Sequence, residues 1–154
     1  MFGSVTEFFF RHLAGINQRP GTRGFSSIVF KPAILMTPKF LAVCANLSSV
    51  SSRLLRPNGE IVATWDCAAD HRGISYTIRT PVGVPSSAHL PVAATAAATV
   101  VTFSDGAGAG TVVWTGSKYV SGVAGVESAM MAPDGKSVVV GLGPGAYTFT
   151  TTPA

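Results

Sequence analysis

Short segments in which apolar and polar residues alternate, divided by turn residues, run through most of this chain and constrain its fold more than any other feature. In residues 74–79 (ISYTIR) every second side chain is apolar, as in a strand with one buried face. Asn58-Gly59 and Asp134-Gly135 are strong hairpin signals between such segments. Turn signals recur every ~8–12 residues, a spacing typical of an antiparallel sandwich. We therefore expect a mainly β chain folded as an antiparallel β-sandwich. No crossover helices are evident, so a parallel sheet is not expected.

The alternation predicts strands in a series of segments, and the polar stretch at 17–24 is expected to be a linker. The expected strands are 25–32, 41–47, 49–56, 60–67, 73–81, 87–91, 95–103, 111–116, 119–123, 136–143 and 146–152.

One segment departs from this pattern and predicts a short N-terminal α-helix over about residues 5–14. Ser4 and Glu7 have the spacing of a capping box, and Gly15 suits the left-handed residue that ends a helix. The sequence therefore predicts two parts, a helix within residues 1–16 and a β-sandwich over residues 17–154.

The composition limits the classes of partner. Hydrophobic residues make up 47% of the chain and charged residues only 12%, against roughly 25% charged in a typical soluble domain. The chain should therefore hide more surface than usual or present a face to a partner. Its net charge of +4 comes from scattered cations, and nucleic-acid binding needs a concentrated basic face, so no nucleic acid is expected as a partner.

No membrane span is expected, because no uninterrupted apolar run reaches ~18 residues. No signal peptide is expected either, since Glu7 stands where a basic region should be and Arg11 interrupts the apolar run. These patterns leave open whether the chain is cytoplasmic or is secreted as part of a longer protein.

Cys44 and Cys67 both fall in expected strands. They could form one disulfide or remain two buried thiols, and the thiols are the favoured interpretation because a single pair is no disulfide framework.

The carboxylates form no recognisable catalytic pair. Only Asp66 and Asp70 are close in sequence, with His71 beside them. A glycosidase needs two carboxylates that face each other across a sugar, and a strand end followed by a polar loop explains this pair equally well. The segment also lacks the fourth ligand of a zinc site. We expect no catalytic residue, no metal site and no cofactor.

Three aromatic residues are candidate platforms for stacking on a sugar. Trp114 and Tyr119 flank a Thr-Gly-Ser turn, and Trp65 lies at the end of an expected strand. The favoured interpretation for the tryptophans is nevertheless burial in the core of a sandwich.

The order of motifs resembles the junction between the catalytic and C-terminal domains of the bacterial-type α-L-rhamnosidases, which are inverting glycoside hydrolases. The opening FGSVTEFFFRHLAGI is similar to the last helix of the family's (α/α)6 barrel, with Phe8 where tryptophan is usual. Later segments follow in the family's order: Gly24-Phe25 through Ile28, Phe30 and Pro32; Gly59, Ile61 and Trp65; Ile74, Tyr76, Ile78, Pro81, Gly83, Ala88, Leu90 and Pro91; and Val140, Gly141, Gly143, Gly145, Tyr147 and Phe149. The segment RLLRPNG departs from the family's pattern, and residues 102–135 form a longer connection than is usual.

This resemblance implies an accessory, structural β-sandwich domain. The family's general acid and general base lie in the barrel, upstream of the matching segment, so none of its catalytic residues can be assigned in this chain. Two other functions stay open: a lectin-like carbohydrate-binding module and a small hydrolase with an unrecognised site. Whether the chain is an enzyme therefore also stays open.

The resemblance also suggests a partner for the helix. Phe8, Phe9 and Phe10 give it an apolar face that needs a large neighbour. That neighbour is expected to be the missing (α/α)6 catalytic domain or a second copy of the chain.

Overall fold

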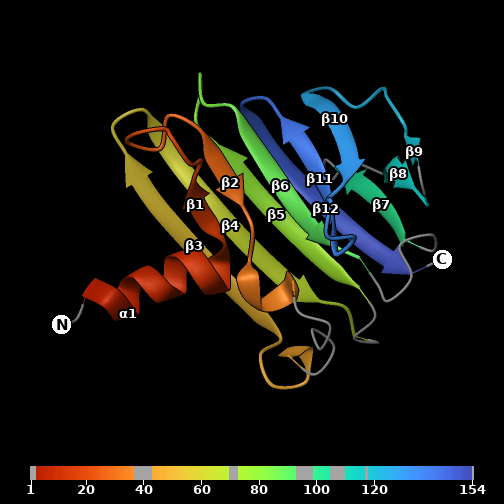
Figure 1. Cartoon of the computed structure of the whole chain (residues 1–154), viewed down its shortest axis with the longest axis horizontal. Helices are drawn as coiled ribbons and strands as arrows, with labels where there is room; N and C mark the ends of the chain where they lie inside the picture. The colour runs from red at the N-terminus through yellow and green to blue at the C-terminus, as the bar shows by residue number, and fades with distance from the viewer. Residues whose placement is uncertain are drawn as a thin grey trace.

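Two stacked β-sheets form the body of the protein in a computed structural model, with the N-terminal helix at one end (Figure 1). The structure describes residues 3–36, 43–69, 73–92, 99–104, 110–116 and 118–153, without the side chains of Ile34, Met36 and Pro153. The described ends of the chain lie at opposite ends of the long axis (Figure 1). The expected class, a mainly β sandwich with one short N-terminal helix, is confirmed.

The larger sheet has seven strands in the order β3-β4-β5-β12-β7-β8-β9, and every neighbouring pair in it is antiparallel. Its strands are β3 (Ser49–Arg56), β4 (Gly59–Cys67), β5 (Ile74–Thr80), β12 (Gly145–Pro153), β7 (Thr99–Ser104), β8 (Thr111–Thr115) and β9 (Lys118–Tyr119).

The smaller sheet has five strands in the order β1-β2-β6-β11-β10. Its strands are β1 (Ile16–Gln18), β2 (Ile28–Phe30), β6 (Ser86–Pro91), β11 (Ser137–Leu142) and β10 (Val126–Met131). A single 3-10 turn, η2 (Ala33–Met36), follows β2.

One strand pair corrects the expectation of a purely antiparallel fold. β2 and β6 run parallel, with Ile28 opposite Ser86 and Phe30 opposite Ala88. Parallel neighbours need a long connection, usually a helix. In this chain the connection contains β3, β4 and β5 of the other sheet, so the absence of crossover helices did not exclude a parallel pair.

Both hairpins expected from their turn residues are present. β3 and β4 pair from Ser49–Asp66 to Arg56–Gly59 around the Asn58-Gly59 turn. The Asp134-Gly135 turn joins β10 to β11, and Gly135 has a φ of 66° there. A positive φ is readily adopted only by glycine and a few polar residues, which explains why these dipeptides predict hairpins.

Four local predictions were wrong or incomplete. The expected strand at 119–123 is wrong beyond Tyr119, where β9 ends. The expected strand at 41–47 is wrong in its described part, since residues 43–44 are helical and a turn follows. β1 lies in the expected linker, where two of its three residues are polar. β10 was not predicted because a bulge between Val126 and Ser128 shifts its register and disturbs the alternation.

Large apolar side chains from both sheets fill the space between them. The largest fully buried ones include Phe30, Trp65, Tyr76, Leu90 and Phe149. The ring of Tyr76 meets that of Phe30 edge to face, with 6.5 Å between centroids. These contacts join β5 of the large sheet to β2 of the small one, as expected for two sheets that share one core.

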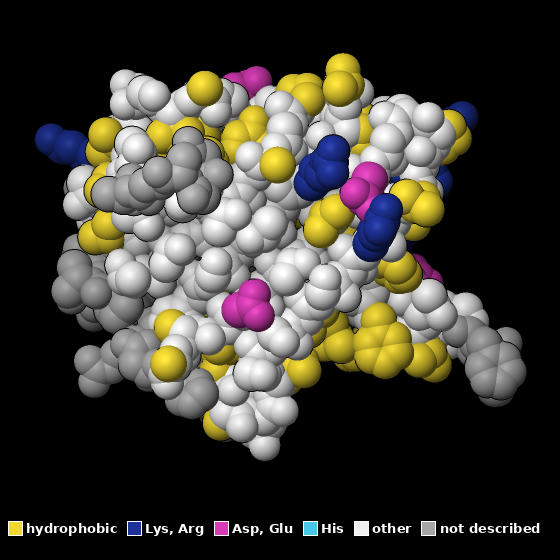
Figure 2. All heavy atoms as spheres, turned by 180° about the vertical axis from the view of Figure 1, so that it is seen from behind, with side chains coloured by type: hydrophobic (Ala, Val, Ile, Leu, Met, Phe, Trp, Pro, Cys, Tyr) yellow, Lys and Arg dark blue, Asp and Glu magenta, His cyan; other side chains and the backbone are white. Residues whose placement is uncertain are grey.

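The outer face of the seven-stranded sheet is dominated by short hydroxyl side chains rather than charges. Ser51 pairs with Thr64 at 2.9 Å and Thr77 pairs with Thr148 at 3.0 Å, in both cases through their hydroxyl oxygens. Figure 2 shows this face as mostly uncharged, with a small group of basic and acidic side chains near one edge. The low charged fraction of the sequence is therefore visible on the surface.

Within the described residues, no helix is long and apolar enough to cross a membrane.

Candidate functional site

The N-terminal helix has one end anchored to the sandwich and one end exposed. It begins as an α-helix, α1 (Gly3–Phe8), and widens into a π-helical turn, η1 (Phe9–Ala14). Gly15 ends it with a φ of 82°, and its N–H donates to the carbonyl of Phe10. The expected helix over 5–14 and the expected role of Gly15 are thus confirmed.

The C-terminal end of the helix is anchored to the core by side chains of the large sheet. Trp65 Nε1 donates to the carbonyl of Leu13 at 2.8 Å, and the Tyr76 hydroxyl donates to the carbonyl of Ala14 at 3.0 Å. The last carbonyls of a helix have no partner within it, so these bonds satisfy groups that burial would otherwise leave unpaired. Burial raises the pKa of Tyr76 well above its ordinary value, which keeps its hydroxyl protonated as a donor.

The N-terminal half of the helix, in contrast, lies against little of the described protein. α1 has no buried residue, and Val5, Phe8 and Phe9 are 54%, 49% and 53% exposed. Phe10 is half-buried against the core. Figure 2 shows hydrophobic side chains gathered at lower right, at the end of the molecule that carries the helix.

Between η1 and β3 the surface is hollowed into an apolar groove, which we call the docking groove. It has a volume of about 490 Å³ and is partly open to solvent. Its lining is Phe9, Phe10, Leu13, Leu47, Val50, Ser51, Ser52 and Arg53. The groove and the exposed phenylalanines form one continuous apolar feature, because Phe9 belongs to both.

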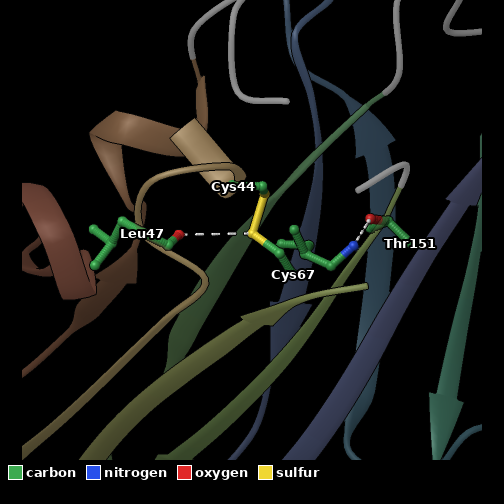
Figure 3. The surroundings of a disulfide bond; sticks show 5 residues. Cys44, Leu47, Cys67 and Thr151 are labelled. Atoms are coloured by element: carbon green, nitrogen blue, oxygen red, sulfur yellow. Dashed lines mark hydrogen bonds between the residues drawn. A yellow bond between two sulfur atoms is a disulfide. The ribbon is translucent and has the colours of Figure 1, made fainter. Parts of the chain in front are cut away.

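A disulfide lies behind one wall of this groove. Cys44 and Cys67 are bridged, with their Cα atoms 5.8 Å apart (Figure 3). The favoured expectation of two buried thiols was therefore wrong. It placed Cys44 in a strand, whereas the helical turn at residues 43–44 directs its side chain at the end of β4. A bridged sulfur carries no hydrogen, so the 4.0 Å approach of Cys67 Sγ to the Leu47 carbonyl is a contact rather than a donated bond.

Comparison with known proteins identifies the family of this architecture. The family model described as "Bacterial alpha-L-rhamnosidase C-terminal domain" matches residues 15–103. The chain belongs to this family. The match covers β1 to β6 and most of β7, including the strands that hold the helix and the groove, and it confirms the resemblance seen in the sequence motifs.

Two solved structures share the fold of this rhamnosidase C-terminal domain. The α-L-rhamnosidase from Dictyoglumus thermophilum superposes with a TM-score of 0.68 at 23% identity, over 98% of this chain and 14% of that one. The Streptomyces avermitilis α-L-rhamnosidase, solved in complex with L-rhamnose, gives 0.62 at 18% identity, over 97% of this chain and 11% of that one. The chain thus spans a small part of the length of either enzyme. No curated protein sequence matches it.

The aromatic residues proposed as sugar platforms lie mostly inside the C-terminal domain. Trp65 is fully buried and Trp114 is 4% exposed, so neither indole presents an open face. Tyr119 is half-buried, and its hydroxyl donates to the carbonyl of Val126 at 3.0 Å. The structure does not bring the three together as a platform. Sugar binding stays a prediction that no observation tests.

The proposed carboxylate pair is only half visible. Asp66 is exposed at the end of β4, while Asp70 and His71 lie outside the described residues. Glu60 forms ion pairs with Arg53 and Arg79 on the outer face of the large sheet. The described residues contain no group of three or more metal-ligating side chains.

Sequence reasoning found the helix but missed the groove that completes it. Leu47 and Val50 were assigned only to strands, and nothing in their spacing placed them beside Leu13. The available signal was the alternation in β4, which puts Trp65 on the inner face. A buried tryptophan needs an acceptor for its N–H, and the helix end supplies one.

Proposed function

We propose that the chain acts as an accessory, structural domain that packs its N-terminal helix and docking groove against the helical catalytic domain of an α-L-rhamnosidase-like protein, and has no hydrolytic activity of its own. In this proposal residues 1–16 belong to the interface and residues 17–154 to the supporting sandwich. The observation that carries the proposal is a helix rigidly anchored at one end with exposed phenylalanines at the other.

Exposed phenylalanines on an anchored helix are costly unless something covers them. Burying a phenylalanine side chain contributes roughly 1.5–3 kcal/mol, and Phe8 and Phe9 leave about half of that unused because each is close to half exposed. A contiguous apolar patch of this kind marks an interaction site on a soluble protein. A partner that covers the helix would recover this energy.

The known structures support a partner within the same polypeptide. This chain covers only 14% and 11% of the two α-L-rhamnosidases that share its fold. Most of each of those enzymes lies outside the matched domain, so such a domain has a large neighbour available. The resemblance of FGSVTEFFFRHLAGI to the last barrel helix favours the catalytic barrel as that neighbour over a second copy of this chain.

The lack of independent activity rests on the positions of the described carboxylates. Glu7 pairs with Arg11 at 2.9 Å along the helix, and Asp134 accepts a backbone bond from Lys136 in its turn. Glu60 is engaged by two arginines. A glycoside hydrolase needs a pair of carboxyl groups about 5–10 Å apart across its substrate, whereas Glu7, Glu60 and Asp134 are each held in a local contact with a basic side chain or with the backbone of a turn.

A hydrolysis assay tests the catalytic part of the proposal. The purified chain should show no turnover of an aryl α-L-rhamnoside above the uncatalysed rate. Turnover that is lost on Asp66→Asn or Asp70→Asn would refute it, because it would show that the strand end after β4 is an active site.

Light scattering tests the docking part. Without its partner the chain should self-associate at high concentration through the helix face, and Phe9→Ser should reduce this association. Val82→Ser is the matched control, since Val82 is 86% exposed in the turn between β5 and β6. If the wild type stays monomeric and Phe9→Ser changes neither solubility nor stability, the helix is not an interface.

A further inference from the structure

We propose that the Cys44–Cys67 disulfide is a redox latch on the docking groove. With the bridge intact, the Leu47 wall of the groove and the anchored end of the helix are held in place, and reduction of the bridge loosens both. The consequence for docking rests on the function proposed above, whereas the structural change does not.

The bridge ties the segment that carries Leu47 to the end of β4. Leu47 N donates to the carbonyl of Val43 at 2.8 Å, so one tight turn separates Cys44 from Leu47. Cys67 Sγ lies 4.0 Å from the Leu47 carbonyl, and Cys67 N donates to the carbonyl of Ser48 at 2.8 Å. Figure 3 shows the Leu47 carbonyl directed at the bridge, while its side chain points to the opposite side. Displacement of this turn therefore moves Leu47 directly.

The same bridge lies close to the anchor of the helix. Trp65, which holds the carbonyl of Leu13, precedes Cys67 by two residues on β4. Leu47 and Leu13 both line the groove. The latch thus joins the two supports of the groove, the turn at Leu47 and the end of β4, at one covalent point.

The bridge can be opened by a dithiol reductant without any group from the protein. Cys44 is 2% exposed and Cys67 is half-buried, so a reductant thiolate reaches Cys67 Sγ more readily. Its attack breaks the Sγ–Sγ bond, and the electron pair leaves on Cys44 Sγ, which takes up a proton. The second thiolate of the reductant then displaces Cys67 as a thiolate, which is also protonated. Two electrons and two protons pass to the protein, and the dithiol becomes a disulfide.

Amide hydrogen exchange and tryptophan fluorescence on the full chain test the latch. The background variant is Trp114→Phe, which leaves Trp65 as the one tryptophan of the sequence, so that the fluorescence reports on Trp65. Dithiothreitol should release two thiols per chain. Exchange at residues 10–15 should then accelerate on the order of tenfold or more, as expected for a local opening. Trp65 emission should shift to the red, and exchange at residues 76–79 of β5 should accelerate by a smaller factor, set by the global loss of stability on reduction. The double variant Cys44→Ser/Cys67→Ser should reproduce these changes without reductant.

Two results would overturn the proposal. Unchanged exchange at residues 10–15 with two free thiols would show that the bridge does not hold the helix end. Equal acceleration of amide exchange in β5 would show that the bridge stabilises the whole fold rather than the helix end in particular. Failure of the oxidised chain to bind a rhamnosidase catalytic domain would refute the proposed docking and leave the exchange result standing, so the two failures are distinguishable.

Discussion

Tyr76→Phe is the sharpest perturbation of the helix anchor, because it removes one oxygen and leaves the ring in place. The Tyr76 hydroxyl donates to the carbonyl of Ala14, and both residues are fully buried. The phenylalanine ring still packs edge to face on Phe30, so the loss of apolar contact is small. The substitution therefore tests the hydrogen bond to the helix almost alone.

The magnitude follows from the buried acceptor that the substitution leaves behind. An unsatisfied buried carbonyl costs about 1–3 kcal/mol, and a domain of this size loses roughly 2–4 °C in Tm for each kcal/mol. We expect urea unfolding of Tyr76→Phe to show a loss in that range with an unchanged m-value. Amide exchange should accelerate first at residues 10–15, because the lost bond lies at the end of the helix.

Tyr119→Phe is the matched control. Its hydroxyl also donates to a backbone carbonyl, that of Val126 at 3.0 Å, but Tyr119 is only half-buried, so water can replace the lost donor. Its loss should be clearly smaller. If Tyr76→Phe costs less than ~0.3 kcal/mol, or no more than Tyr119→Phe, the idea that core side chains anchor the helix is refuted.

Three further predictions concern the sandwich. Burial lowers the pKa of His89 to about 4 from its ordinary value of 6.5, so the unfolded chain binds the proton first, and stability should fall as pH drops from about 6.5 to 4. Because His89 is partly exposed the loss is on the order of 1–2 kcal/mol, and urea titrations of His89→Gln should lack it. In Gly125→Ala the new Cβ would lie 2.1 Å from the Tyr147 hydroxyl at a φ of +80°, so thermal melts should show a loss above about 1 kcal/mol. Gly83→Ala, with φ +75° and open space, separates backbone strain from this clash. Breaking the disulfide, whose cysteines are 23 positions apart in sequence, should cost about 3 kcal/mol in urea unfolding, and an unchanged midpoint would contradict the assignment.

The strands with clean alternation were predictable because one physical signal determined them. β5 has buried residues at every second position from Ile74 to Thr80, and the Asn58-Gly59 turn sets the register of β3 on β4. Helix termination was equally local, since Gly15 adopts a conformation that few other residues tolerate. These elements depend on neighbours in the sequence, and a pattern along the chain is enough to find them.

The features that were missed depend on contacts between segments far apart in the sequence. β1 is a strand only because β2 lies beside it, with Ile16 opposite Phe30. The bridge between Cys44 and Cys67 depends on a helical turn that no alternation predicts. Hydrophobic periodicity shows which face of a segment is buried, but not which other segment buries it. The docking groove is formed by such contacts and therefore could not be predicted from the sequence.

The anchored end and the exposed end of the helix are best explained by a single role in docking. If the helix served the sandwich alone, its phenylalanines would be expected at the end where Trp65 and Tyr76 hold the backbone, since that end already faces the core. Instead, the anchored end contributes backbone carbonyls to the core. Phe8 and Phe9 precede the half-buried Phe10 in the helix, and their rings are exposed. An element fixed by hydrogen bonds at one end and apolar at the other holds its free face in a defined direction before any partner arrives. Such preorganisation lowers the ordering cost of association, so the rigidity of the anchor, as much as the phenylalanines themselves, should determine how tightly the helix docks.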